Sequence, residues 1–218
     1  MQATSQQMQR NQDRQTKLND NLHGFAAIGD SAVEIRAPKV FESSFNADSP
    51  HPADGAKIAP QRLQPPFVTL PGLKLTYEAF ADGADEKSYP YYCYLAAVQG
   101  SAADASKLAD DLARQLRAGL PGGGGWESVD CPTPDGGTLA CRRIRATGKQ
   151  LFDATASGGG RARFVPLEGT FDLYLHEAGG WITLVGFRVP TPLAEKFKLD
   201  DVGPLAVGTL KASQAAGA

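Results

Sequence analysis

The hydrophobic pattern of this 218-residue chain predicts an α+β domain, with an antiparallel sheet of about six to seven strands flanked by helices. Short β-prone segments run to about residue 100, one amphipathic helix follows, and further alternating segments fill residues 126–189. Several of these segments are joined by tight turns, and a tight turn joins antiparallel neighbours. The content of hydrophobic residues (42%) and of charged residues (21%) is that of an ordinary globular domain.

The first part of the chain predicts three strands. Residues 33–36 (Val-Glu-Ile-Arg) are β-prone, and Pro38 limits this strand or places it at a sheet edge. Residues 73–80 alternate between apolar and polar side chains, which predicts a half-buried strand. Its predicted apolar face carries Leu73, Leu75 and Tyr77, and its opposite face carries Lys74, Thr76 and Glu78. Residues 89–98 are rich in tyrosine and fit a central strand.

Residues 101–120 predict the one clear helix. Ser101 is placed to cap the free N–H groups of the first turn, and Asp104 completes a capping box. Leucine recurs every four residues, which gives one apolar stripe along the helix. Pro121 and the glycines after it end the helix.

Two hairpins and a short helix are predicted in the second half. Residues 126–131 and 138–145 flank the turn sequence Pro-Thr-Pro-Asp-Gly-Gly, and residues 171–177 and 181–189 flank Ala-Gly-Gly. The Gly-rich residues 154–163 between the hairpins are predicted to be a loop. A C-terminal helix is predicted near residues 204–213, with proline in its first turn.

The chain divides into a tail and a single domain. Residues 1–29 are polar and rich in Gln and Asn, so we expect either a solvated tail or polar helix, or a tether to an anchor or a partner. Residues 30–213 form the predicted α+β domain, with a long Pro- and Ala-rich loop over residues 46–71. Residues 214–218 are predicted to be a disordered tail.

The three cysteines leave two interpretations open. Cys131 and Cys141 flank the first hairpin almost symmetrically, so they are a candidate disulfide in an oxidising compartment and two small thiols otherwise. Cys93 lies among aromatic residues and is predicted to be a core thiol, because no histidine motif accompanies it.

A local basic patch marks the predicted strand at residues 138–145. Its members are Arg142, Arg143 and Arg145, together with Lys149 just beyond the strand. The patch is either an ordinary solvated sheet face or a contact surface for an anionic partner.

Polar side chains on the second hairpin are the other candidate site. Asp172 and Tyr174 share one strand face by the two-residue period, and the partner strand is expected to bring Arg188 near them. With His176, these residues would form the site of a small-ligand-binding protein or a hydrolase.

Several function classes have no sequence signal. The glycines at 122–125 follow a helix and precede a strand, the reverse of a phosphate-binding loop. The three histidines are scattered and no nucleophile motif is present, so we predict no catalytic residues, no cofactor and no metal. The formal net charge of −2 comes from interspersed signs, which argues against a nucleic-acid partner. No apolar run reaches the roughly 18 residues that a membrane span needs.

The order of the segments resembles the PsbP-like family, which includes the PsbP subunit of the photosystem II oxygen-evolving complex and the Ran-binding Mog import factors. The resemblance covers about residues 30–213 and departs at the two long loops. It rests on the proline-closed strand at 33–38, the strand pair before the helix at 101–120, the strand at 126–131, and the segments at 169–177 and 181–190. It implies an antiparallel sheet between helices and a non-catalytic role in binding or assembly. No functional residue is carried over.

We therefore predict a non-catalytic binding or assembly domain, an accessory subunit with a protein partner. The alternative is the small-ligand-binding protein or hydrolase with its site on the sheet face. The PsbP-like family includes bacterial lipoproteins, which favours an exported or periplasmic protein anchored through a leader outside this chain, with a cytoplasmic protein as the alternative.

Overall fold

A computed structural model describes residues 2–41, 43–46, 60–83, 87–156 and 163–214 of the chain. These residues form an α+β structure with antiparallel sheets, which confirms the predicted fold class. The helices are α1 (Gln2–Asn21), α2 (Pro60–Leu63), α3 (Ala102–Gly119), α4 (Thr191–Ala194) and α5 (Leu199–Val207). The strands are β1 (Leu22–Ala27), β2 (Val33–Pro38), β3 (Ser43–Asn46), β4 (Leu73–Asp82), β5 (Lys87–Gln99), β6 (Glu127–Pro132), β7 (Thr138–Ala156), β8 (Arg163–Ala178), β9 (Trp181–Pro190) and β10 (Lys211–Ala212).

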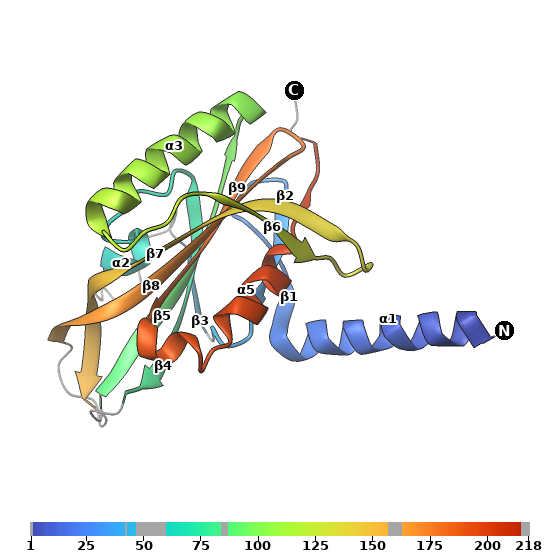
Figure 1. The fold of residues 1–218 in the computed structure, drawn as a ribbon, viewed down its shortest axis with the longest axis horizontal. Helices are drawn as coiled ribbons and strands as arrows, with labels where there is room; N and C mark the ends of the chain where they lie inside the picture. Colours follow the sequence, from blue (N-terminus) through green and yellow to red (C-terminus); the bar gives the residue numbers. More distant parts are fainter. Residues whose placement is uncertain (1, 42, 47–59, 84–86, 157–162, 215–218) are drawn as a thin grey trace.

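The main sheet lies between two covering layers (Figure 1). Its seven strands run in the order β3-β4-β5-β9-β8-β7-β6, and all neighbours are antiparallel. α3 covers one face of this sheet. α5 and a small sheet of three strands, β1-β2-β10, cover the other face.

The α3 layer follows directly from the sequence of that helix. Asp104 N–H donates to the Ser101 hydroxyl (3.3 Å) and Ser101 N–H donates to the Asp104 carboxylate (3.0 Å), which is the predicted capping box. Leu112 and Leu116 are fully buried against side chains of the main sheet. The predicted helix and the direction of its apolar stripe are therefore confirmed.

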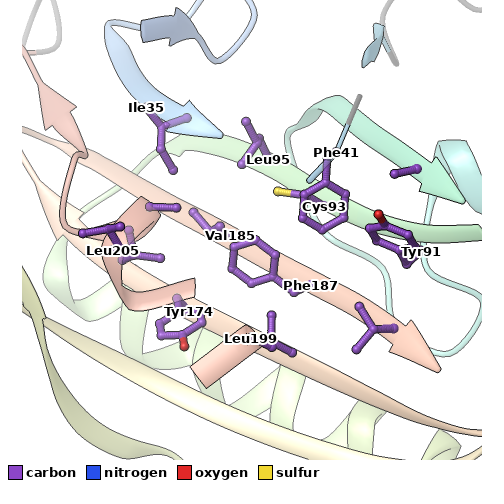
Figure 2. Packing of buried hydrophobic residues seen from close by; sticks show 14 of the residues in the cluster. Ile35, Phe41, Tyr91, Cys93, Leu95, Tyr174, Val185, Phe187, Leu199 and Leu205 are labelled. Carbon is purple, nitrogen blue, oxygen red and sulfur yellow. The ribbon is translucent and has the colours of Figure 1, made fainter. Parts of the chain in front are cut away.

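The second core lies between the main sheet and the layer of β2 and α5 (Figure 2). Cys93 on β5 and Phe187 on β9 point into it, together with Ile35 of β2 and Leu205 of α5. Because β5 and β9 are buried on both faces, their sequences are nearly continuous apolar runs rather than alternating ones. The Tyr-rich strand at 89–98 is thus central, as predicted.

β4 differs from its predicted pattern. The pairing of β4 with β5 shifts register between Leu73 and Leu75, which indicates a bulge. Leu73 therefore packs in the α3-side core, whereas Leu75 and Tyr77 pack on the opposite core. The predicted common face for these three residues was wrong, because a bulge inserts one residue and changes the side to which the following side chains point.

The face of β4 that we predicted to be polar is also covered. Thr76 and Glu78 are buried, because α2 lies over them. The Thr76 hydroxyl donates to the Arg62 carbonyl (2.7 Å), and Arg62 Nε donates to the Glu78 carboxylate (2.6 Å). α2 belongs to the segment that was predicted to be a long loop at 46–71; residues 47–59 of that segment lie outside the described residues.

β7 and β8 are much longer than predicted. Their pairing extends from Arg142 opposite Leu175 to Ala154 opposite Arg163, and Gly148 lies opposite Gly169 midway. β9 ends at Pro190, and beyond this point β5 pairs with β7 instead of with β9. Residues 154–156 and 163 of the predicted Gly-rich loop are therefore strand, and residues 157–162 lie outside the described residues.

The C-terminal segment corrects another prediction. The last helix is α5, so it begins at Leu199 rather than near residue 204, and Pro204 lies inside it. Asp200 and Asp201 stand in its first turn, where carboxylates favour helix initiation. β10 follows and pairs with β2, where we predicted helix. Of the predicted disordered tail at 214–218, residues 215–218 lie outside the described residues.

The polar N-terminal stretch contains two elements. Gln2–Asn21 is the helix α1, and β1 follows at once and pairs with β2. The small sheet therefore begins within residues 1–29, which the sequence assigned to the tail. Leu18 and Leu22 are buried and join this end of α1 to the second core.

Candidate functional site

The structure divides the predicted binding residues between the two faces of the main sheet. Arg143 and Arg145 on β7 lie opposite Tyr174 and Asp172 on β8, on the face that α5 covers. Two other predicted residues, Arg142 and Arg188, lie on the α3 face. Arg188 is opposite Phe171 rather than beside Asp172, so the expected cluster of Asp172, Tyr174 and Arg188 was wrong.

Arg145 is the centre of an ion-pair network. Its Nε donates to Asp172 Oδ1 (2.6 Å), and its Nη2 donates to Asp172 Oδ2 and to Asp200 Oδ1, both at 2.5 Å. Asp172 is fully buried, so the guanidinium supplies the pairing that a buried carboxylate requires. The hydrogen bond to Asp172 raises the pKa of Arg145. The charge of Arg145 is therefore already matched by two carboxylates of the chain itself.

Arg143 continues this network toward the edge of the sheet. Its Nε donates to Glu127 Oε1 (2.8 Å) on β6, and its Nη1 lies 3.9 Å from Asp200 Oδ1. Burial raises the pKa of the neighbouring Tyr174. An anionic partner would have to displace these carboxylates, so this part of the predicted basic patch is not a free cationic surface.

A cavity of about 470 Å³ lies beside Arg145, between β7–β8 and the segment of α4 and α5. Three threonine side chains and several charged groups line it, namely Thr147, Thr170, Thr191, Glu195, Lys198, Asp200 and Asp201. Lys198 has a left-handed backbone (φ 48°), the one such non-glycine residue among those described. Strained backbone of this kind is concentrated at functional sites. The lining offers hydroxyls and charges of both signs, which suits a small polar ligand.

On the α3 face, Arg188 is a core residue. Its Nε donates to Gln150 Oε1 (2.9 Å), its Nη2 donates to the Leu151 carbonyl (2.7 Å), and its guanidinium carbon lies 4.3 Å from the centroid of the Phe152 ring. The side chain is fully buried. Its interactions fix the long β7 strand against the end of β9, which is a structural role.

Arg142 and His176 lie at a second hollow, a groove of about 520 Å³. α3 forms one wall of the groove, and β6, β7 and β8 form its floor. Arg142 Nη2 donates to the Ala105 carbonyl (3.0 Å), and the guanidinium lies over the Trp126 ring. His176 Nδ1 lies 3.1 Å from the Ala140 carbonyl oxygen.

All three cysteines are buried thiols. Cys131 pairs with Leu139, and Cys141 pairs with Val129, so the two cysteines are diagonal rather than directly opposite. The hydrogen bond between them lowers the pKa of Cys131 and raises that of Cys141. The disulfide stays a prediction, and counting reactive thiols in denatured, unreduced protein tests it: one thiol supports the bridge, and three thiols contradict it.

No group of three or more His, Cys, Asp or Glu side chains among the described residues could hold a metal ion. None of the described helices combines the length and the apolar content that crossing a membrane requires.

Sequence reasoning missed Asp200, Lys198 and Gln150. The first-turn position of Asp200 was a usable signal once the start of α5 was known. Lys198 gave no signal, because lysine has no preference for the left-handed conformation. Gln150 gave none either, since its role depends on the pairing of β7 beyond residue 145.

Comparisons with known proteins add little. No protein-family model matches the chain, and no curated protein sequence matches it. A crystal structure from Bacteroides thetaiotaomicron VPI-5482 is similar over 68% of this chain and 48% of that chain, with 16% sequence identity and a TM-score of 0.28. The chain thus spans about half the length of that protein. A likeness at this TM-score carries no argument, and the PsbP-like resemblance stays a prediction.

Proposed function

We propose that this chain is a non-catalytic binding or assembly domain, an accessory subunit of a larger protein complex. The observation that carries the proposal is α1, a polar helix of 20 residues that extends away from the body of the domain (Figure 1). A largely polar helix either bridges between domains, is held by pairs of side chains along its length, or is unstable by itself, and we infer the first role for α1. The PsbP-like resemblance supports the same role, and anchoring through a leader outside this chain belongs to the proposal.

The contacts of α1 with the domain come from its C-terminal half. Leu18 is buried, the Asn19 side chain accepts from Arg36 Nη2 (3.0 Å), and Gln15 Nε2 donates to the Pro134 carbonyl (3.5 Å). Met8, in the other half, is 68% exposed. The half of α1 without these contacts has about ten residues, which is too short for a stable isolated helix in water, so a partner along this half would stabilise it.

The test compares the full chain with a variant that lacks residues 1–10, each tagged and purified from the native source at low salt. The full chain should elute in a complex above its own mass of 23.1 kDa. The shortened variant should lose that partner and keep the same melting temperature, because the side chains described within this segment, at residues 6 and 8–10, are exposed. A full chain that always elutes alone at its monomer mass would overturn the proposal.

The cavity beside Arg145 is the observation that favours the alternative, a small-ligand-binding protein. A thermal-shift screen with small polar compounds tests it, with Lys198→Gly as the probe of the strained residue. Glycine adopts φ 48° without strain, so this variant should itself be more stable. If Lys198 contacts a ligand, the variant should also lose the ligand-induced shift; a screen without any shift argues against this function.

A further inference from the structure

We infer that the exposed edge of β6 is the docking site for an extended basic peptide segment of a partner, which adds to the main sheet as a further strand. This inference rests on the proposed function and names the chemistry of the partner. It follows from three features of the same region: the free edge of β6, the groove beside it, and two carboxylates in that groove.

β6 is an edge strand, because it pairs with β7 alone in the main sheet of the described residues. Thr133 N–H donates to the Gly137 carbonyl (3.0 Å) in continuation of the β6–β7 register, so these residues form a hydrogen-bonded pair. In an antiparallel ladder such pairs alternate. The backbone N–H and C=O groups of Ser128, Asp130 and Pro132 therefore point away from β7.

The three outward positions of β6 differ in what covers them. Pro132 has no N–H, and its carbonyl oxygen lies only 2.0 Å from where a Cβ on Gly208 would be, so the end of α5 closes this part of the edge. Ser128 and Asp130 are exposed. Their outward N–H and C=O groups are the kind of template to which an extended peptide adds.

The groove of about 520 Å³ runs beside this open segment on the α3 face. Ala102 and Ala105 form part of its α3 wall, and their short side chains keep it open. A strand added to β6 would place every second side chain on this face of the sheet. Those side chains would enter the groove.

The charge of the groove indicates that the added strand should carry basic side chains on this face. Asp130 lies opposite Ala140. The β7–β8 pairing begins at Arg142 opposite Leu175, and the same register continued by two residues brings Ala140 opposite Glu177. The two carboxylates therefore stand on either side of a small residue, roughly 10 Å apart across three strands. Both residues are exposed, and neither forms an ion pair with any residue that the structure describes.

The one cation that lines the groove does not neutralise this pair. Arg142 lies one position along the same face of the sheet, opposite Ser128, and is held against α3 by the Ala105 carbonyl and the Trp126 ring. A lysine or arginine of an added strand would lie over Ala140 and reach both carboxylates.

The same charges disfavour a second copy of this chain as the occupant. Pairing β6 with β6 of another copy would bring the Asp130 carboxylates of both chains to one seam. Like charges across paired strands are destabilising, and exposed charges on an edge strand are a common protection against such pairing. A basic segment has the complementary charge.

The test measures binding of a labelled seven-residue peptide, capped at both ends, with lysine alternating with valine or threonine. A peptide with glutamate in place of lysine is the charge control, and the lysine peptide with alternate backbone N-methylation is the pairing control. We expect the lysine peptide to bind at low salt, and both control peptides to bind at least about tenfold more weakly.

Protein variants locate the site. Asp130→Asn combined with Glu177→Gln should weaken binding of the lysine peptide at least about tenfold, because both charges are lost and the shapes are kept. The matched control, Asp82→Asn combined with Glu168→Gln, removes two exposed carboxylates elsewhere on the sheet and should leave affinity unchanged. Ser128→Pro removes an outward N–H without touching the β7 ladder, so it should weaken binding while the melting temperature stays close to that of the parent chain.

The outcomes separate this inference from the proposed function. No binding of the lysine peptide, or equal binding to all the protein variants, overturns the docking site. If the full chain still elutes with a partner from its native source, the assembly function stands and only the β6 site is wrong.

Discussion

At the scale of single residues, burial decides what a charged side chain does in this protein. Arg188 is fully buried and is bound by Gln150, the Leu151 carbonyl and the face of Phe152. Arg145 is bound by two carboxylates. Both residues looked like candidate binding groups in the sequence, yet the folded chain satisfies both of them internally.

Asp153 is the counterexample, an acid whose surroundings disfavour its charge. Desolvation raises its pKa, although Arg188 and Arg62 act in the opposite direction. The native state therefore holds this proton more tightly than the unfolded chain does, so ionised Asp153 destabilises the fold at neutral pH. The contribution of Asp153 to the free energy of unfolding therefore rises as the pH falls from the pKa of the folded state toward the ordinary value of 3.8.

Asp153→Asn should accordingly raise the melting temperature at pH 7, because the amide has no charge to desolvate. The gain should shrink as the pH is lowered to 3.8 and below, where the parent carboxyl becomes protonated in the unfolded chain as well as in the folded one. Differential scanning calorimetry across this pH range measures the effect, and Asp82→Asn, at an exposed carboxylate, is the control. A variant that is less stable at pH 7 would show that attraction to the two arginines outweighs desolvation.

At the scale of elements, the joint between α5 and β6 depends on one glycine. Gly208 is the C-cap of α5 and has an ordinary helical backbone (φ −61°). A Cβ there would lie 2.0 Å from the Pro132 carbonyl oxygen and 2.7 Å from its carbon. Backbone atoms cannot move aside as the end of a flexible side chain can, so the need for glycine is steric.

Gly208→Ala should therefore destabilise the protein by about 1–3 kcal/mol, the usual cost of forcing extra volume into a packed site. Chemical denaturation measures the loss. Gly125→Ala is the matched control, since nothing lies within 4 Å of a Cβ at that position. Equal stability of the two variants would mean that α5 moves away from β6 without cost.

The elements that the sequence predicted well are those with a local signal. The capping box and leucine stripe of α3 are contained in one helix, and Gly179 and Gly180 have the positive φ that their hairpin turn needs. The distal halves of β7 and β8 lack such a signal, because Thr147 to Lys149 break the apolar alternation and pairing partners alone define the strand there. The predicted cluster of Asp172, Tyr174 and Arg188 was wrong for the same reason. Which residues lie opposite each other depends on the register of the strands, and a shift of one residue moves a side chain to the other face of the sheet.

At the scale of the whole molecule, the main sheet contributes side chains to two hydrophobic cores, one on each face. On β5, Tyr92 and Tyr94 point to the α3-side core, whereas Cys93 and Leu95 point to the core under α5. β9 alternates in the same way. Neither core can lose its packing without exposing strands that also hold the other, so the described domain should unfold as one unit.

The chain's two tryptophans report on these cores separately, which makes the cooperativity testable. Trp126 donates to the Ala109 carbonyl (2.8 Å) on α3, and Trp181 packs against the opposite core. Fluorescence of the two single-tryptophan variants, Trp126→Phe and Trp181→Phe, and circular dichroism of each should give coincident urea transitions. Adding Leu112→Ala, at a fully buried position under α3, should shift both reporters together by about 2–5 kcal/mol. A shift confined to the α3-side reporter would show that the two layers unfold independently, and that the shared strands do not couple them.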